Sequence, residues 1–420
     1  MTNIELGYGK TSVNFAFDEA RFSVLANSSL PETPLTDPQI GASFDSPISC
    51  ASLDEIVSSG DSVLIVVSDA TRATGSTQIV NLLVRRLIQH GVSAGDVAII
   101  FATGIHRSVT AQEQVELLTS FITQRIRTLT HDAYQPRGMT SLGVTRRGIK
   151  VDVNRALTEF SRVILTGGIG YHYFAGFTGG RKSVCPGLAS AATIEATHML
   201  ALDFTVGGRR SGVGPGRLDG NAVHEECDQI AEMVAPAFGV NAVVDERGRV
   251  VNLFCGDWRV AHRAASDHYL SDHSVPITAR RELVIVSCGG LPYDINLIQA
   301  HKALEMASYA CQDGGSIILL AQCKDGLGRP DFLKWFGEAD SLALEGRLRT
   351  GYEVNGQTAW SLLSKAERFH VYLVSDLPDQ EVRHMRMIPA RSLDDALTKI
   401  GQDTSGFILP RGAALLPRFV

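Results

Sequence analysis

Short runs of apolar, mostly β-branched residues recur along the chain, and they constrain its fold more than any other feature. Each run is almost continuously apolar and does not alternate with polar residues. Strands of this kind are buried on both faces, as in parallel sheets that helices cover on each side. Six runs have this character: residues 62–68, 97–102, 162–166, 283–287, 316–321 and 369–375.

Helical patterns lie between these runs, so the sequence predicts an α/β fold. Two of the patterns begin with a capping box, Ser52 with Glu55 and Thr110 with Glu113, whose side chains satisfy free amides of a first helical turn. A polar stretch at 265–280 separates two series of strands. We therefore expect two α/β domains with mainly parallel sheets and a cleft between them. The expected domains cover 1–272 and 273–420, and the last residues are expected to pack back on the first domain.

Composition excludes several classes of protein. The 420 residues include 39 Lys+Arg and 45 Asp+Glu, a net charge of −6, which disfavours a basic nucleic-acid footprint. No apolar run approaches the ~18 residues of a membrane span, and the N-terminus has no signal-peptide pattern. The seven cysteines are scattered without a C-x-x-C pair. We expect reduced thiols in a cytoplasmic protein, without a membrane or nucleic-acid partner.

Polar residues and glycines follow four of the runs, at 69–72, 103–107, 167–172 and 289–294. Because parallel sheets bind ligands at the carboxyl ends of their strands, these segments predict one catalytic cleft. The glycine-rich stretch 167–187 is the most informative of them. It is not a P-loop, since Arg181 stands where that motif needs glycine. With Arg181 and Lys182 it could hold phosphate; the alternative is a surface loop.

Several single residues have two interpretations. Lys182 is either a solvated lysine or a covalent attachment point. His198 follows Glu195 by three residues in a helical pattern, so it is either one ligand of a metal or a histidine bonded to that carboxylate. His106 and His172 are either a pair of acid/base groups or structural hydrogen-bonding residues.

Arg72 is either a carboxylate-binding residue or a structural partner of Asp69. In the 294–304 segment, Asp294 is expected to cap a helix. Gln299 and Lys302 point away from the apolar stripe of that helix, either into solvent or into the cleft.

In this order, these motifs resemble those of the nickel-dependent lactate racemase family of 2-hydroxy acid racemases and epimerases. The resemblance spans about residues 60–390, and its most specific part is the segment that ends in Gly-Gly-Arg-Lys. The motifs are Asp69-Ala-Thr-Arg72, Gly104-Ile-His-Arg107, Tyr171-His-Tyr-Phe-Ala-Gly-Phe-Thr-Gly-Gly-Arg-Lys182, Thr197-His198 and Gln299-x-x-Lys302.

The resemblance implies a nickel-pincer nucleotide, a pyridinium mononucleotide with two thio-acid arms, made by separate cofactor-synthesis enzymes. Lys182 matches the lysine that holds it covalently, and His198 matches the protein ligand of nickel. Sulfur donors with one imidazole suit square-planar nickel. The remaining matches are Asp69 and Arg72 for cofactor contacts, His106 and His172 for acid/base catalysis, and Arg72, Gln299 and Lys302 for substrate contacts.

The chemistry of such a reaction favours hydride transfer. Removing the C2 proton beside an ionised carboxylate builds a dianion, whereas removing hydride while a base takes the hydroxyl proton gives a planar 2-keto acid. We expect lactate or another short aliphatic 2-hydroxy acid as substrate. The alternatives are a malate or sugar-acid racemase or epimerase of the same family, a phosphate-binding kinase or ligase, and a non-catalytic nickel- or cofactor-binding protein.

Overall fold

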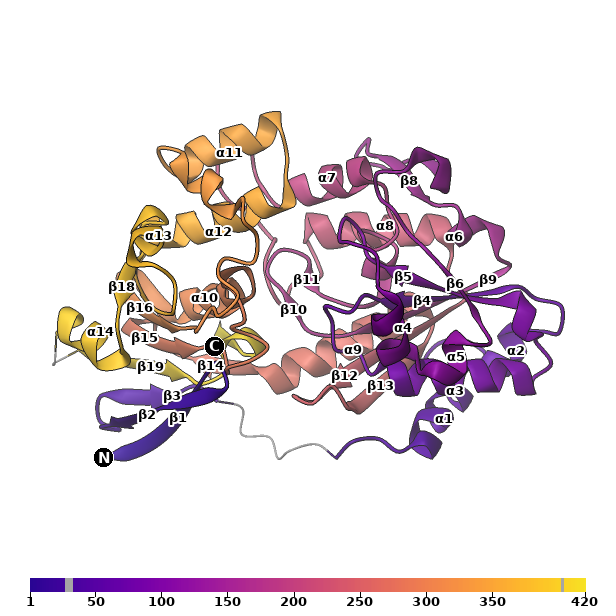
Figure 1. The fold of residues 1–420 in the computed structure, drawn as a ribbon, viewed down its shortest axis with the longest axis horizontal. Coiled ribbons are helices and arrows are strands. Elements are labelled where there is room, and N and C mark those ends of the chain that lie inside the picture. Colours follow the sequence, from indigo (N-terminus) through magenta and orange to yellow (C-terminus); the bar gives the residue numbers. More distant parts are fainter. Residues whose placement is uncertain (27–32, 402–403) are drawn as a thin grey trace. The chain divides into compact units, whose positions relative to one another are not determined.

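The computed structural model describes residues 1–26, 33–401 and 404–420, which divide into two compact units (Figure 1). Unit 1 consists of Met1–Ser28, Leu202–Arg209 and Asp272–Val420, and unit 2 of Ser29–Ala201 and Arg210–Ser271. Each unit contains a six-stranded sheet, and all six apolar runs form strands of these two sheets. The predicted fold class, α/β with mainly parallel sheets, is confirmed.

The sheet of unit 2 has the strand order β13-β12-β9-β4-β5-β6, and all neighbours are parallel except β13 with β12. Successive residues of β4 alternate between two hydrophobic cores, with Val63 and Ile65 in one and Leu64 in the other. This two-sided burial explains why the run is continuously apolar. The strands are β4 (Val63–Ser68), β5 (Val97–Ala102), β6 (Arg127–Leu129), β9 (Arg162–Gly168), β12 (Phe238–Val244) and β13 (Val250–Gly256).

Helices cover both faces of this sheet (Figure 1). Both expected capping boxes are present, at the starts of α2 and α4. Two small hairpins, β7–β8 (Met139–Val144, Lys150–Asn154) and β10–β11 (Tyr171–His172, Gly176–Phe177), lie outside the main sheet. The helices are α1 (Asp37–Asp45), α2 (Leu53–Ile56), α3 (Ser76–Gln89), α4 (Ala111–Leu118), α5 (Ser120–Thr123), α6 (Ala156–Glu159), α7 (Ala191–Met199), α8 (Ala222–Val234) and α9 (Trp258–His273), the last of which ends in unit 1.

The sheet of unit 1 is parallel throughout, in the order β18-β17-β16-β15-β19-β3. Its central strands also alternate between two cores, since Val284 packs in one and Leu283 in the other. The strands are β3 (Phe22–Val24), β15 (Arg281–Ser287), β16 (Cys311–Leu320), β17 (His370–Val374), β18 (Ile388–Ala390) and β19 (Gly406–Leu409).

Four helices pack on one face of this sheet, and α14 with the β1–β2 hairpin packs on the other. A short parallel pair, β14–β20, completes unit 1. The elements are β1 (Thr2–Tyr8), β2 (Thr11–Phe17), β14 (Ser274–Ile277), β20 (Leu416–Phe419), α10 (Leu297–Ala310), α11 (Ser341–Thr350), α12 (Val354–Arg368), α13 (Asp379–His384) and α14 (Leu393–Ile400).

The expected first domain, residues 1–272, needs correction at its N-terminus. Residues Met1–Ser28 belong to unit 1 because β3 pairs in parallel with β19. Leu202–Arg209 also belongs to unit 1, between two stretches of unit 2. The C-terminal residues Leu416–Phe419 form β20, which pairs with β14 inside unit 1.

The expected cap at Asp294 is also wrong. Asn296 caps α10, where its side chain accepts a hydrogen bond from the Gln299 amide. Asp294 is instead fully buried, and its Oδ2 accepts the amides of Gly9 (2.7 Å) and Gln322 (3.1 Å). Asp294 therefore ties the N-terminal hairpin to the sheet.

Within the described residues, no helix is long and apolar enough to cross a membrane. All seven cysteines are free thiols, and six of them are buried.

Candidate functional site in unit 2

Three of the four polar strand ends lie at one edge of the unit 2 sheet, because β9, β4 and β5 are parallel neighbours. The fourth, after β15, belongs to unit 1. Asp69 follows β4 and His106 follows β5. Nδ1 of His106 lies 2.7 Å from Oδ2 of Asp69, and the carboxylate is buried whereas half of the imidazole is exposed.

The Asp69 carboxylate is held ionised. Burial alone would raise its pKa, but hydrogen bonds from His106 and from the Thr71 hydroxyl (2.6 Å) outweigh burial, so the pKa is lowered. An ionised carboxylate only accepts hydrogen bonds, so Nδ1 of His106 is the donor. In the neutral ring, Nε2 of His106 then keeps a lone pair and can accept a proton.

The ring of Phe174 lies among three of the predicted site residues. Its centroid is 4.4 Å from that of His172 and 4.9 Å from that of His198, both in edge-to-face geometry, and 5.7 Å from Nζ of Lys182. Phe174 is buried, so its position is fixed by packing. This one side chain therefore brings together the predicted acid/base, metal-ligand and attachment residues.

His172 differs from His106 in its hydrogen bonding. Its Nδ1 accepts a hydrogen bond from the amide of Ala175 at 3.2 Å. A neutral imidazole that accepts at Nδ1 carries its proton on Nε2. Nε2 of His172 is thus a hydrogen-bond donor, whereas Nε2 of His106 is a hydrogen-bond acceptor.

Lys182 lies in a short 3-10 helix, Gly180–Ser183, with no carboxylate paired to it among the described residues. Burial lowers the pKa of its amine well below the usual value, and the charge of Arg72 lowers it further. A lysine with a lowered pKa has a larger fraction of neutral, nucleophilic amine.

The neighbouring Arg181 is almost completely buried and donates hydrogen bonds to backbone carbonyls. Its guanidinium donates to the carbonyls of Phe177 (3.2 Å) and Ala175 (2.8 Å) and to Nε2 of His262 (2.7 Å). Burial lowers its pKa to about 10, so it remains protonated at neutral pH. The expectation that Arg181 helps to hold phosphate is therefore not supported. It fixes the chain between His172 and Lys182 instead.

His198 is buried near the end of α7, a helix capped by the Ser190 hydroxyl. Burial and the nearby charge of Lys182 lower its pKa to about 3, so the imidazole is neutral at pH 7. Glu195 is exposed whereas His198 is buried. The two side chains therefore do not share one buried site, although they lie three residues apart on the helix. Within the described residues, no cluster of three or more His, Cys, Asp or Glu is arranged for a metal.

Arg72 is exposed and has no ion pair among the described residues, because Asp69 binds His106 instead. It lines a cavity of about 300 Å³ at the N-terminus of α3, together with Thr74, Ser76 and Arg249. Helix N-termini and arginines both favour anions. The cavity therefore suits a negatively charged group.

Gln299 and Lys302 lie on α10 of unit 1, where Nζ of Lys302 donates to Oε1 of Gln299 at 2.6 Å. The predicted apolar stripe of that helix is confirmed, since Leu297, Ala300 and Leu304 are fully buried. Unit 2 thus contains six of the eight predicted site residues, and unit 1 contains these two.

The chain matches models of two protein domains in the same order. The lactate racemase N-terminal domain matches residues 8–206, and the lactate racemase C-terminal domain matches residues 277–416. The chain belongs to the lactate racemase family. It is an α/β enzyme of the isomerase class, like the relatives whose names follow.

Two lactate racemases align with the chain over nearly its whole length. The protein from Thermoanaerobacterium thermosaccharolyticum is 29% identical and both chains are fully covered. The protein from Lactiplantibacillus plantarum is 29% identical and covers 99% of this chain and 100% of its own. The apoprotein structure of lactate racemase from T. thermosaccharolyticum superposes with a TM-score of 0.91 over 99% of this chain and 100% of the other, at 28% identity.

Sequence reasoning missed the roles of Phe174 and Arg181. Phe174 was part of an aromatic stretch next to His172, but nothing in the pattern distinguished it from Tyr173 or Phe177. A buried arginine that serves carbonyls has no spacing signal at all. The one available clue for Arg181 was its position between glycines and Lys182.

Proposed function

We propose that this protein racemises or epimerises 2-hydroxy acids with a nickel-pincer nucleotide held by Lys182 and His198. The supporting observation is the contact of one buried ring, Phe174, with His172, Lys182 and His198. Family membership supports the same reaction class. The proposal includes a cytoplasmic location and maturation by cofactor-synthesis enzymes.

The residues fit such a cofactor. Lys182 offers an amine of lowered pKa, and His198 a neutral imidazole, the form of the ring that binds a soft metal. The cavity at the N-terminus of α3 suits the phosphate of a mononucleotide. Beside the attachment segment, both side-chain polar atoms of buried Asn241 lack a hydrogen-bond partner among the described residues.

In the segment before Lys182, two glycines let the backbone pass close to neighbouring side chains. Gly180 has a φ of +49°, and a Cβ there would lie 2.7 Å from the ring of His262. Gly179 has a φ of +77°, and a Cβ would lie 2.7 Å from Ile169. Both residues must be glycine for the chain to present Lys182 in this position.

The two histidines supply the proton chemistry. Nε2 of His106 accepts the hydroxyl proton of one enantiomer, and Asp69 stabilises the imidazolium that results. On the other side, the oxygen of the planar 2-keto acid accepts a hydrogen bond from Nε2–H of His172, and it takes a proton from this ring when the imidazole carries a proton on both nitrogens. When bound, the cofactor supplies the acceptor for the hydride that leaves C2. Each direction of the reaction therefore needs one ring in its neutral form, as the base, and the other ring in its protonated form, as the acid.

The cations of unit 2 favour a monocarboxylate substrate. Arg72 has no ion-pair partner among the described residues and can bind the C1 carboxylate. Arg107 is instead held by both oxygens of Glu113, a partly buried carboxylate that also accepts the Thr110 amide, and Arg181 is engaged by backbone carbonyls. Neither is available for the second carboxylate of malate, so we propose lactate or a slightly longer aliphatic 2-hydroxy acid.

A substrate panel tests this function. Protein co-expressed with the cofactor-synthesis enzymes is expected to interconvert the enantiomers of lactate or 2-hydroxybutyrate, with kcat/KM at least tenfold higher than for malate. One methylene alone changes binding by only ~1–3 kcal/mol, so lactate and 2-hydroxybutyrate should differ less. A preference for malate would overturn the substrate proposal. Nickel binding without racemisation of any of the three would favour a non-catalytic cofactor-binding protein.

His198→Ala is expected to lower nickel content more than tenfold and to remove activity, because it deletes the proposed protein ligand. Nickel is measured by elemental analysis of purified protein, and the fold by circular dichroism. His131→Ala is the matched control, since His131 is also buried in unit 2 and also neutral, with its pKa lowered to about 4 by burial. Equal nickel content in the two variants would contradict the assignment.

A further inference from the structure

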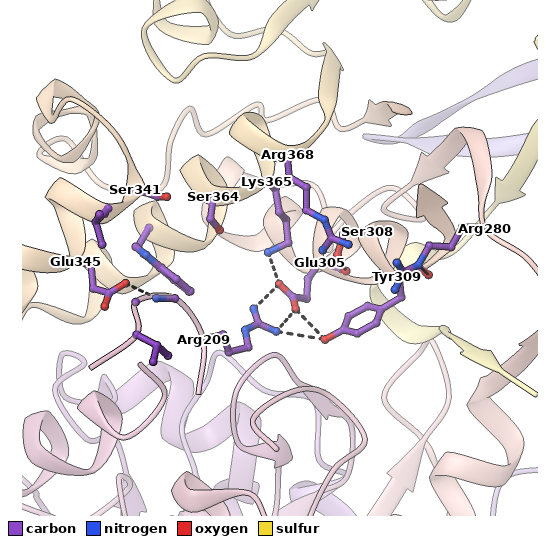
Figure 2. A pocket seen from close by; sticks show the side chains of 15 residues that line it. Arg209, Arg280, Glu305, Ser308, Tyr309, Ser341, Glu345, Ser364, Lys365 and Arg368 are labelled. Carbon is purple, nitrogen blue, oxygen red and sulfur yellow. Dashed lines mark hydrogen bonds and ion pairs between the residues drawn. The ribbon is translucent and has the colours of Figure 1, made fainter. Parts of the chain in front are cut away.

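Unit 1 contains a cavity of about 480 Å³ that none of the site residues named above lines (Figure 2). Its walls come from the Leu202–Arg209 segment and from helices α10, α11 and α12. We call it the Glu305 pocket, after the acid at its floor. Its volume is within the range of ~300–1,000 Å³ typical of small-molecule sites.

The floor of the Glu305 pocket is a buried charged network. Glu305 is 1% exposed and accepts two hydrogen bonds from the Arg209 guanidinium, at 2.5 and 3.0 Å. Lys365, whose side chain is 8% exposed, forms an ion pair with the same carboxylate. Figure 2 shows both cations converging on Glu305. One carboxylate therefore faces two cations in a region that water reaches poorly.

Lys365 also donates to the carbonyl and the hydroxyl of Ser361, so its hydrogen bonds are made, but the lining of the pocket as a whole is positive, because it holds the four cations Arg209, Arg280, Lys365 and Arg368 and only the two acids Glu305 and Glu345. Burial lowers the pKa of the Lys365 ammonium although Glu305 acts in the opposite direction. The other acid in the wall, Glu345, accepts the amide of Gly208 at 2.8 Å, and burial raises its pKa. A net positive charge in a poorly hydrated cavity costs free energy, and an anion bound in the cavity would offset that cost.

Two further arginines line the pocket and are exposed. Arg280 lies over the ring of Phe419, at 5.4 Å, and no carboxylate is paired with it among the described residues. Arg368 is paired with Asp313, a side chain that is 71% exposed and does not line the pocket. Exposed pairs of this kind are weak and exchange readily with other anions.

We propose that the Glu305 pocket binds a small oxyanion that carries at least two negative charges, either a phosphate-type ion or a polycarboxylate. Arg280 and Arg368 would contact it first, and Arg209 and Lys365 would lie beneath it. The hydroxyls of Ser308 and Ser364 also line the cavity, but each donates its hydrogen bond to a backbone carbonyl, so the four cations are the groups that would bind the ion. None of the residues that line this pocket is among the proposed racemase residues, so the proposal does not depend on the racemase chemistry.

Calorimetric titration of the full-length protein tests the proposal, with inorganic pyrophosphate and citrate as the two probes. Ionic strength is kept near ~10 mM, where exposed charges are little screened. We expect saturable binding of at least one probe, and at least tenfold weaker binding in the double variant Arg280→Ser/Arg368→Ser. These two residues are exposed, so the variant should fold, as circular dichroism would verify.

The matched control is Arg383→Ser/Arg391→Ser, which removes the same charge from exposed positions of unit 1 outside the pocket. It should bind like the parent protein. Equal weakening in both double variants would show a general charge effect and overturn the proposal, as would absence of saturable heat with both probes. Unchanged affinity in Arg280→Ser/Arg368→Ser would place binding elsewhere, for example at the α3 cavity. Preference for pyrophosphate or for citrate identifies the class of ion.

Discussion

Lys182→Ala is expected to abolish both covalent cofactor attachment and racemisation. The amine is the proposed nucleophile, and no other side chain at this position of the glycine-rich segment can replace it. Intact mass of protein co-expressed with the cofactor-synthesis enzymes is the direct measurement. The parent protein should carry a mass adduct, and the variant should have the mass of the bare chain.

Two further variants sharpen this experiment. Lys182→Arg keeps a positive charge but offers no nucleophilic amine at neutral pH, so it should also lack the adduct. Lys150→Ala removes an exposed lysine of unit 2 and should keep both adduct and activity. An adduct that persists on Lys182→Ala would show that the cofactor is attached elsewhere or not covalently.

His106→Ala and His172→Ala are each expected to lower the rate of racemisation by ~10²–10⁴-fold in both directions, the usual contribution of a general acid or base. One ring takes the hydroxyl proton on one side of the substrate and the other returns it on the opposite side, so each cycle needs both. The rate is measured from each pure enantiomer. Nickel content and the mass adduct should stay unchanged, which separates proton transfer from cofactor loading.

Asp69→Asn tests the assignment of His106 as the initial acceptor. The Asn amide can either donate to Nδ1 of His106 or accept from it, so only part of the rings would carry the proton on Nε2 and lose the base. We expect a smaller loss of rate than in His106→Ala. His90→Ala, at an exposed position after α3, is the control and should be fully active. A near-full rate of racemisation in His106→Ala or in His172→Ala would mean that the substituted histidine has only a structural role.

Much of this architecture could be predicted from local sequence pattern. The six apolar runs became the central strands because each is buried on both faces by a separate core. The capping boxes at Ser52 and Thr110 involve neighbouring residues, so they could be recognised directly. Asp69, Arg72, His106 and His172 were also expected from the rule that ligands bind at strand carboxyl ends, whereas Lys182 and His198 were expected from the family resemblance.

Long-range contacts could not be predicted in this way. Asp294 was expected to act within its own helix, but it binds the amide of Gly9, 285 residues away. Residues Phe22–Val24 gave no reason to expect a partner at Gly406–Leu409. Arg181 resembled a ligand-binding cation, and only the buried carbonyls around it show that it supports the backbone. In each case the deciding partner lies on another element of the structure.

The pairing of β3 with β19 also affects how the protein is made. Phe22–Val24 is synthesised long before Gly406–Leu409, the strand with which it pairs. Unit 2 ends at Ser271 and can complete its sheet while the chain is still growing. Unit 1 cannot complete its sheet at that stage, because β3 has no partner until Gly406–Leu409 has been synthesised. Until then the backbone groups of β3 stay unpaired. Premature termination beyond residue 271 would therefore leave a folded unit 2 attached to an exposed N-terminal segment, a state prone to aggregation.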